Sequence, residues 1–134
     1  MEETHANGKS RRILIVDDND LNNQYLRTLL LRHNFTVDVA TDGPAAIALV
    51  RSHRPDVVLL DVMMPGMSGL EVLQQLRTDS SQHDIPVILV TARSQDDDIL
   101  NGYQEGADYY LTKPFTTRQL LHGLGLVLGV RLVD

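Results

Sequence analysis

The chain has 134 residues, of which 43% are hydrophobic and 22% charged, and its formal net charge is -6 at pH 7. This length and composition predict one ordinary globular domain with a full hydrophobic core. The absence of cysteine excludes a disulfide framework, a thiolate metal site and a cysteine nucleophile, and the acidic balance argues against nucleic acid as a direct partner.

Residues 1–11 are polar and lack the apolar stretch of a signal peptide. No later segment offers the roughly 18 uninterrupted apolar residues of a membrane span. We therefore expect a cytoplasmic protein with no membrane partner. We predict a flexible N-terminal segment over 1–11, one folded domain over 12–129 and a short C-terminal tail over 130–134.

Five short apolar runs predict the strands of a parallel sheet, at residues 13–16, 35–39, 57–60, 87–90 and 109–111. Three of these runs are almost continuous in β-branched residues and Leu. Helices are therefore expected on both faces of those strands.

Segments with helical spacing alternate with the strands. Leu21, Tyr25 and Leu29 stand four residues apart, with Leu26 and Leu30 beside them, and this stripe predicts a first helix over about 20–33. The second helix is marked by apolar residues at 46, 47 and 50, and the third by leucines at 70, 73 and 76.

Local signals mark the ends of several helices. Ser68 with Glu71 forms a capping box for the third helix, and Thr116 with Gln119 repeats it for the fifth. The fifth helix is predicted to bury leucines at 120, 121, 124 and 128 and to stop at Gly129. The fourth, near 95–105, has the weakest apolar face, so we expect it to be the most mobile.

This alternation predicts an α/β fold, a single doubly wound (βα)5 unit with right-handed crossovers. Ligands of such sheets bind at the carboxyl ends of the strands. In this sequence polar residues stand at four of these ends. Asp17 and Asp18 follow the first strand, Asp61 the third and Thr91 the fourth, and Lys113 follows the fifth after a gap of two residues.

A single Asp at a strand end is often only a turn former or a helix cap. Asn19 and Asp20 can cap the first helix, however, which leaves the preceding acids without a structural role. Three converging carboxylates would repel one another unless Lys113 or a cation compensated them. Oxygen-only ligands favour Mg²⁺, and a phosphoryl group would fit beside it, with Asp61 as the expected nucleophile.

The chain resembles the receiver domains of two-component response regulators over about residues 12–128. Four motifs carry the resemblance, in the expected order and near the usual intervals. They are ILIVDD at 13–18, DVMMPGMSG at 61–69, TA at 91–92 and KPF at 113–115. The resemblance implies a flavodoxin-like sheet with strand order 2-1-3-4-5.

The same resemblance implies roles for individual residues. Asp61 would accept the phosphoryl group, Asp17 and Asp18 would bind Mg²⁺ or substitute Mn²⁺, and Met63 would add its backbone carbonyl. Lys113 would pair with the phosphoryl group and Thr91 would be the switch hydroxyl.

Further residues are implied to tune the pocket. Tyr110 would be the aromatic switch, although it could instead be an ordinary strand residue under the fourth helix. Met63, Ala92, Arg93 and Pro114 flank the pocket, and the Lys113–Pro114 peptide bond is a candidate for the cis isomer.

The implied function is that of a signalling switch rather than an enzyme with a separate substrate. A histidine kinase or a histidine phosphotransfer protein would donate to Asp61, and the domain would catalyse its own phosphorylation and dephosphorylation. The face of the fourth helix, fifth strand and fifth helix would then bind a downstream protein or form a homodimer. In a variant of this function, the run VDDNDLNN at 16–23 resembles the start of receivers attached to hybrid histidine kinases, and the chain would then be a piece of a larger relay protein.

Two alternatives differ in class. A pseudo-receiver would bind its partner without phosphorylation. A haloacid-dehalogenase-like phosphatase also uses Asp, Mg²⁺, Thr and Lys, and Asp18 and Asp20 have the spacing of its acid pair, but its nucleophile lies on the first strand.

Overall fold

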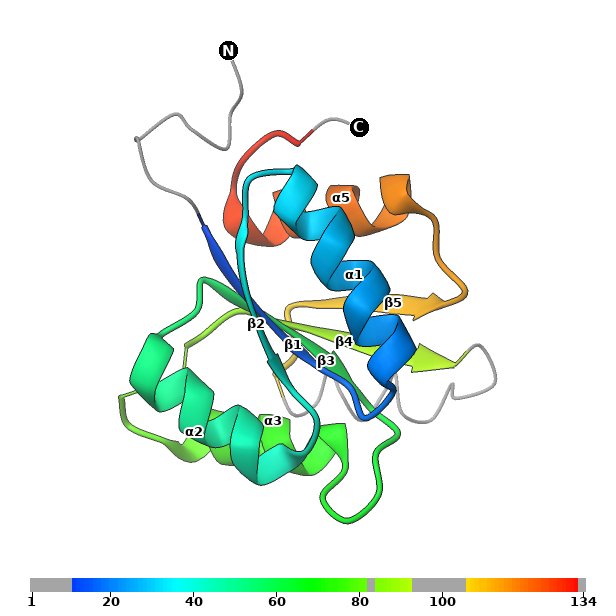
Figure 1. Ribbon diagram of the computed structural model, residues 1–134. Coiled ribbons are helices and arrows are strands. Elements are labelled where there is room, and N and C mark those ends of the chain that lie inside the picture. The colour runs from blue at the N-terminus through cyan, green and yellow to red at the C-terminus, as the bar shows by residue number, and fades with distance from the viewer. Residues whose placement is uncertain (1–10, 82–83, 93–105, 133–134) are drawn as a thin grey trace.

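The computed structural model describes residues 11–81, 84–92 and 106–132 (Figure 1). Its sheet contains β1 (Arg12–Val16), β2 (Thr36–Ala40), β3 (Val57–Asp61), β4 (Val87–Ala92) and β5 (Tyr109–Lys113). The order is β2-β1-β3-β4-β5, and every neighbouring pair is parallel. The predicted fold class and strand order are confirmed.

Helices cover both faces of the sheet. Figure 1 shows α1 (Asp20–Arg32) and α5 (Thr117–Leu128) on one side, and α2 (Gly43–His53) and α3 (Gly69–Thr78) on the other. The predicted fourth helix near 95–105 lies outside the described residues, as do Arg93 and residues 1–10 of the N-terminal segment. Among the helices of the described ranges, none is long and apolar enough to cross a bilayer.

Alternation along the central strands creates two hydrophobic cores. In β1, Ile13 and Ile15 belong to the core under α1 and α5, whereas Leu14 and Val16 belong to the core over α2 and α3. Strand β3 alternates in the same way and is buried throughout. Because both faces of these strands are covered, both sets of side chains are apolar, which explains the continuous runs in the sequence.

The predicted caps are formed. Ser68 and Glu71 make both hydrogen bonds of a capping box at α3, and Thr116 and Gln119 do the same at α5. Gly129 ends α5 with a φ of 71°, in the left-handed region where glycine is favoured. These signals were readable from sequence because each involves residues only three or four apart.

The apolar stripe predicted for α1 matches its buried face only in part. Leu21 and Tyr25 are 76% and 63% exposed, while Asn23, Leu26 and Leu30 are buried. Each residue turns the helix by about 100°, so the residues that follow one another at positions 23, 26 and 30 share a face from which 21 and 25 point away. The i+4 pattern therefore located the helix but not its inward side.

Smaller differences occur at the other element ends. β2 starts one residue later than predicted, and Leu128 is half-buried rather than buried. Strand β4 continues through Thr91 to Ala92. Strand β5 runs to Lys113, so no gap separates this lysine from the strand. Parallel pairing with β4, which extends to Ala92 opposite Lys113, explains why the strand continues through polar residues.

Candidate functional site

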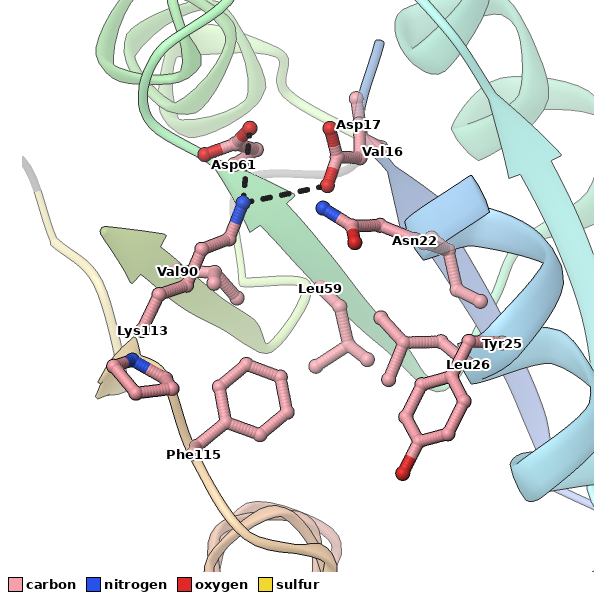
Figure 2. Close-up of a pocket in the computed structure, with 12 residues that line it drawn as sticks. Val16, Asp17, Asn22, Tyr25, Leu26, Leu59, Asp61, Val90, Lys113 and Phe115 are labelled. Atoms are coloured by element: carbon pink, nitrogen blue, oxygen red, sulfur yellow. Dashed lines mark hydrogen bonds and ion pairs between the residues drawn. The ribbon is translucent and has the colours of Figure 1, made fainter. Parts of the chain in front are cut away.

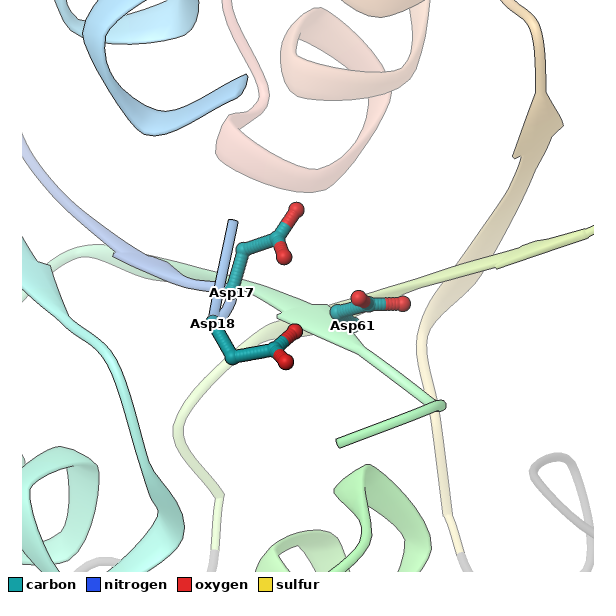
Figure 3. Close-up of side chains that lie close together, drawn as sticks. All are labelled: Asp17, Asp18 and Asp61. Atoms are coloured by element: carbon teal, nitrogen blue, oxygen red, sulfur yellow. The ribbon is translucent and has the colours of Figure 1, made fainter. Parts of the chain in front are cut away.

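The acidic side chains predicted at the strand ends lie together at one edge of the sheet (Figure 3). Asp17 follows β1 directly, and Asp61 is the last residue of β3, the strand beside it. Asp17 and Asp61 are only 5% and 7% exposed, whereas Asp18 is exposed. One carboxylate oxygen from each of the three lies within 4.8 Å of the others. This oxygen-only set is suited to a hard divalent cation.

Lys113 approaches the same cluster from the end of β5. Its Nζ lies 3.5 Å from Asp17 Oδ2 and 3.5 Å from Asp61 Oδ2, and Figure 2 shows the side chain reaching between the two carboxylates. The carboxylates of Asp17 and Asp61 thus share the single positive charge of Lys113. With Asp18 included, the site carries net negative charge. The shortage of positive charge is the electrostatic reason to expect metal binding here.

The pKa of Asp61 reflects chiefly the burial of its carboxyl group. Burial away from water raises the pKa of its carboxyl from 3.8 to about 6, opposed by the attraction of Lys113 and reinforced by the nearby charge of Asp17. A weak hydrogen bond from the Met63 backbone N–H to Asp61 Oδ1, at 3.4 Å, also favours the charged form. Without a metal the carboxylate is therefore held in an unfavourable environment.

Asp17 is fixed by bonds from three directions. Its backbone N–H donates to the Ala40 carbonyl of β2 at 3.1 Å, and its Oδ1 accepts from the Asn19 backbone N–H at 3.0 Å. Its own carbonyl accepts from Asn23 Nδ2 at 2.7 Å. These bonds direct Oδ2 toward Lys113 and the cluster. Asn23 was not identified from sequence, because its inward position depends on which face of α1 packs on the sheet.

The predicted switch residues lie on β4 and β5. Thr91 is completely buried, and its Oγ1 donates a long hydrogen bond to the Ala92 carbonyl at 3.4 Å. Its neighbour Val90 is in register with Asp61, so Thr91 stands one residue further toward the carboxyl edge. Tyr110 is half-buried and packs against the core on the α2 and α3 side. The Lys113–Pro114 peptide bond is cis, as the resemblance implied.

The loop after β3 is held close to Asp61. Met63 is 57% exposed at the rim of the site. The Gly69 backbone N–H donates to the Val62 carbonyl at 2.9 Å, and a Cβ at Gly69 would collide with the Asp61 carbonyl. Gly66 adopts a φ of 77° in the turn between them. Gly69 therefore allows the start of α3 to pack directly on the backbone that carries Asp61.

A largely apolar cavity of about 450 Å³ opens next to the charged cluster. Figure 2 shows Leu26, Leu59, Val90 and Phe115 around it, with Lys113 at the end near the acids. It lies between α1 and the segment after β5. Sequence reasoning missed this cavity because its walls come from β1, α1, β3, β4, β5 and the segment after β5, which meet only in the folded structure.

Comparison with known proteins identifies the family. The family model for the response regulator receiver domain matches residues 13–124. The chain belongs to the response regulator receiver family. The match favours this assignment over the haloacid-dehalogenase-like alternative, in agreement with an acidic cluster that draws on both β1 and β3.

Curated relatives are longer than this receiver chain. It is 46% identical over 116 residues to the sensory transduction protein RegX3 of Mycobacterium bovis, covering 87% of this chain and 50% of that protein. It is 46% identical over 110 residues to the response regulator MprA of Mycolicibacterium vanbaalenii, covering 82% of this chain and 47% of that protein. The chain thus spans about half the length of these relatives.

Solved structures agree with this assignment. The chemotaxis protein CheY4 of Vibrio cholerae is 32% identical with a TM-score of 0.83, covering 90% of this chain and 100% of that one. The signal receiver domain of a histidine kinase from Syntrophus aciditrophicus is 29% identical with a TM-score of 0.83, covering 90% and 91%. Receivers from different protein contexts therefore share this fold.

Proposed function

We propose that this receiver domain accepts a phosphoryl group on Asp61 and uses it to switch a protein-binding surface. The observation that carries the proposal is the position of Asp61, a buried carboxylate beside two further acids and 3.5 Å from the ammonium of Lys113. A carboxylate oxygen of Asp61 attacks phosphorus in line, forming an O–P bond as the P–N bond of a phosphohistidine breaks. The released imidazole takes up a proton from solvent.

Asp17, Asp18 and Asp61 are the residues that would hold Mg²⁺, together with the Met63 backbone carbonyl, and Mn²⁺ is the expected substitute. The fit rests on three oxygen donors within 4.8 Å and on the net negative charge that Lys113 alone does not balance. When bound, the cation neutralises the phosphoryl oxygens and the acids that would otherwise repel them. Lys113 would contribute a second positive charge and pair with the transferred group.

The switch would depend on Thr91, Tyr110 and Lys113. A phosphoryl group on Asp61 gives the Thr91 hydroxyl a stronger acceptor than the Ala92 carbonyl that it now meets at 3.4 Å. Moving Thr91 changes the space next to Tyr110 on the neighbouring strand, which is how the signal would reach the surface of β5 and α5 and the segment near 95–105. Met63, Ala92, Arg93 and Pro114 would set how quickly water removes the phosphoryl group.

The partners follow from this chemistry. The phosphoryl group would come from a histidine kinase or a histidine phosphotransfer protein, and the switched surface would bind a downstream protein or a second copy of the chain. Both reactions at Asp61, its phosphorylation and its hydrolysis to inorganic phosphate, would be catalysed by the pocket itself. We propose a cytoplasmic location for this relay.

Intact mass after incubation with acetyl phosphate tests the proposal. We expect the mass of one phosphoryl group to be gained by the wild type with Mg²⁺, but not in excess EDTA and not by Asp61→Asn. Asp20→Asn is the matched control, because it removes an exposed acid of the first turn of α1 that lies outside the cluster. No gain by the wild type under any condition, together with no binding of beryllofluoride, would point to the pseudo-receiver alternative.

A further inference from the structure

Asn23 is the one buried polar side chain next to the acidic cluster, within the described residues, that the proposed phosphorylation chemistry does not use. It stands on the inward face of α1 and is only 5% exposed, among apolar neighbours such as Leu26 and Leu30 on that face. An amide in such a position costs stability unless it is hydrogen-bonded. Its presence therefore calls for a function that an apolar residue would not provide.

The contacts of Asn23 lead to Asp17. Its Nδ2 donates to the Asp17 carbonyl at 2.7 Å, and this bond is buried. The Oδ1 of the same amide is also buried, and no group of the described residues donates to it. A side chain kept for general stability would be expected to satisfy both ends of its amide. The hydrogen bond that Asn23 does make goes to Asp17, whose carboxylate is a candidate metal ligand.

A small network of hydrogen bonds around Asn19 reinforces the contact between Asn23 and Asp17. Asn19 accepts from the Asn22 backbone N–H with its side chain at 2.9 Å and from the Asn23 backbone N–H with its carbonyl at 3.1 Å. Its own N–H donates to Asp17 Oδ1 at 3.0 Å. The first turn of α1 and the carboxylate of Asp17 are thus joined at two points, through Asn19 to the side chain and through Asn23 to the backbone.

We propose that Asn23 is a positioning residue that sets the divalent-cation affinity of the site by fixing the backbone, and hence the carboxylate, of Asp17. The inference rests on the proposed function, since it assumes that Asp17 is a cation ligand. Groups that orient metal ligands typically change metal affinity or activity by about 10- to 100-fold when they are removed. With the donor removed, Asp17 keeps its charge but loses one of the three bonds that direct it.

Asn23→Leu is the sharpest test, because leucine has nearly the shape of asparagine but no donor. We expect Asn23→Leu to raise the Kd for Mg²⁺, measured by isothermal titration calorimetry, by about tenfold or more. In phosphorylation by acetyl phosphate, the half-saturating Mg²⁺ concentration should rise by the same factor, while the rate at saturating Mg²⁺ stays within about twofold. Gln24→Leu, at an exposed position of the same helix, should leave both values unchanged.

Thermal unfolding in EDTA shows whether Asn23 serves only the stability of the fold. If Asn23→Leu unfolds at a lower temperature but binds Mg²⁺ as the wild type does, the inference is wrong, and it is also wrong if high Mg²⁺ fails to restore the rate. Asn23→Ala answers the same question if the leucine variant does not fold. A wild type that binds no Mg²⁺ would instead refute the proposed function, so the two failures can be told apart.

Discussion

Replacing Asp61 with asparagine is expected to stabilise the metal-free protein. The pKa of the Asp61 carboxyl rises from 3.8 to about 6 on folding, chiefly because burial penalises its charge. One pKa unit corresponds to about 1.4 kcal/mol, so the ionised carboxylate opposes folding by about 3 kcal/mol above pH 7. The carboxamide introduced by Asp61→Asn has almost the same volume and no charge, and it frees Lys113 to pair with Asp17 alone.

The direction of the pH dependence of stability follows from which state binds the Asp61 proton. Between about pH 4 and 6 the folded wild type holds the Asp61 proton while the unfolded chain has released it, so the Asp61 contribution falls as pH rises through this window. Asp61→Asn has no such loss. The unfolding free energy of Asp61→Asn should therefore equal that of the wild type below about pH 4 and exceed it by about 2 to 3 kcal/mol above pH 7.

Urea denaturation in EDTA at pH 4, 5, 6 and 8 measures this advantage directly, with Asp20→Asn as the control for loss of a nearby exposed acid. At pH 8 the melting temperature of Asp61→Asn should exceed that of the wild type by roughly 6 to 12 °C. Added Mg²⁺ should narrow the gap, because it stabilises the folded wild type more than a variant that lacks one ligand. An advantage of equal size at pH 4 and pH 8, or none at pH 8, would refute the electrostatic explanation.

Three further predictions concern Lys113, two closely packed glycines and the buried face of α1. Lys113→Ala should lower the Kd for Mg²⁺ several-fold in calorimetry, because the ammonium competes with the cation for two carboxylates, and a weaker affinity would contradict this. Gly69→Ala should destabilise by about 1 to 3 kcal/mol in urea, since a Cβ there meets rigid backbone. Gly43→Ala should cost less, because its Cβ meets side-chain atoms of a methionine rather than backbone atoms, and equal costs would count against the packing argument. Leu30→Ala should cost about 2 to 5 kcal/mol and exposed Leu21→Ala less than about 0.5, and the reverse order would overturn the assigned face of α1.

Much of the site was predictable because parallel topology brings strand ends together. Asp17, Asp61 and Lys113 are far apart in sequence, but each ends or directly follows a strand, and that alone predicted their convergence. The capping residues were predictable for a different reason, since their partners lie within one helical turn.

What sequence could not provide is how α1 is rotated on the sheet, whereas the apolar residues predicted at 46, 47 and 50 of α2 and at 120, 121 and 124 of α5 do face inward. The leucine spacing located α1 without showing that Asn23 faces inward or that Tyr25 faces out. The cavity beside Lys113 was missed for the same reason, since Phe115 and Leu26 meet only through tertiary packing. In α1 apolar residues occur on more than one face, so its rotation depends on the fit of neighbouring side chains and not on the local pattern alone.

The strands that position the site differ in burial, and so in how well their backbones are protected from solvent. Strands β1 and β3, which carry the acids, are paired on both sides and buried almost throughout, so their amides should exchange hydrogen slowly. Strand β5 ends the sheet of the described residues and is mostly half-buried, so its backbone should exchange faster. Lys113 therefore stands on a strand whose backbone is less protected than that of the strands leading to Asp17 and Asp61.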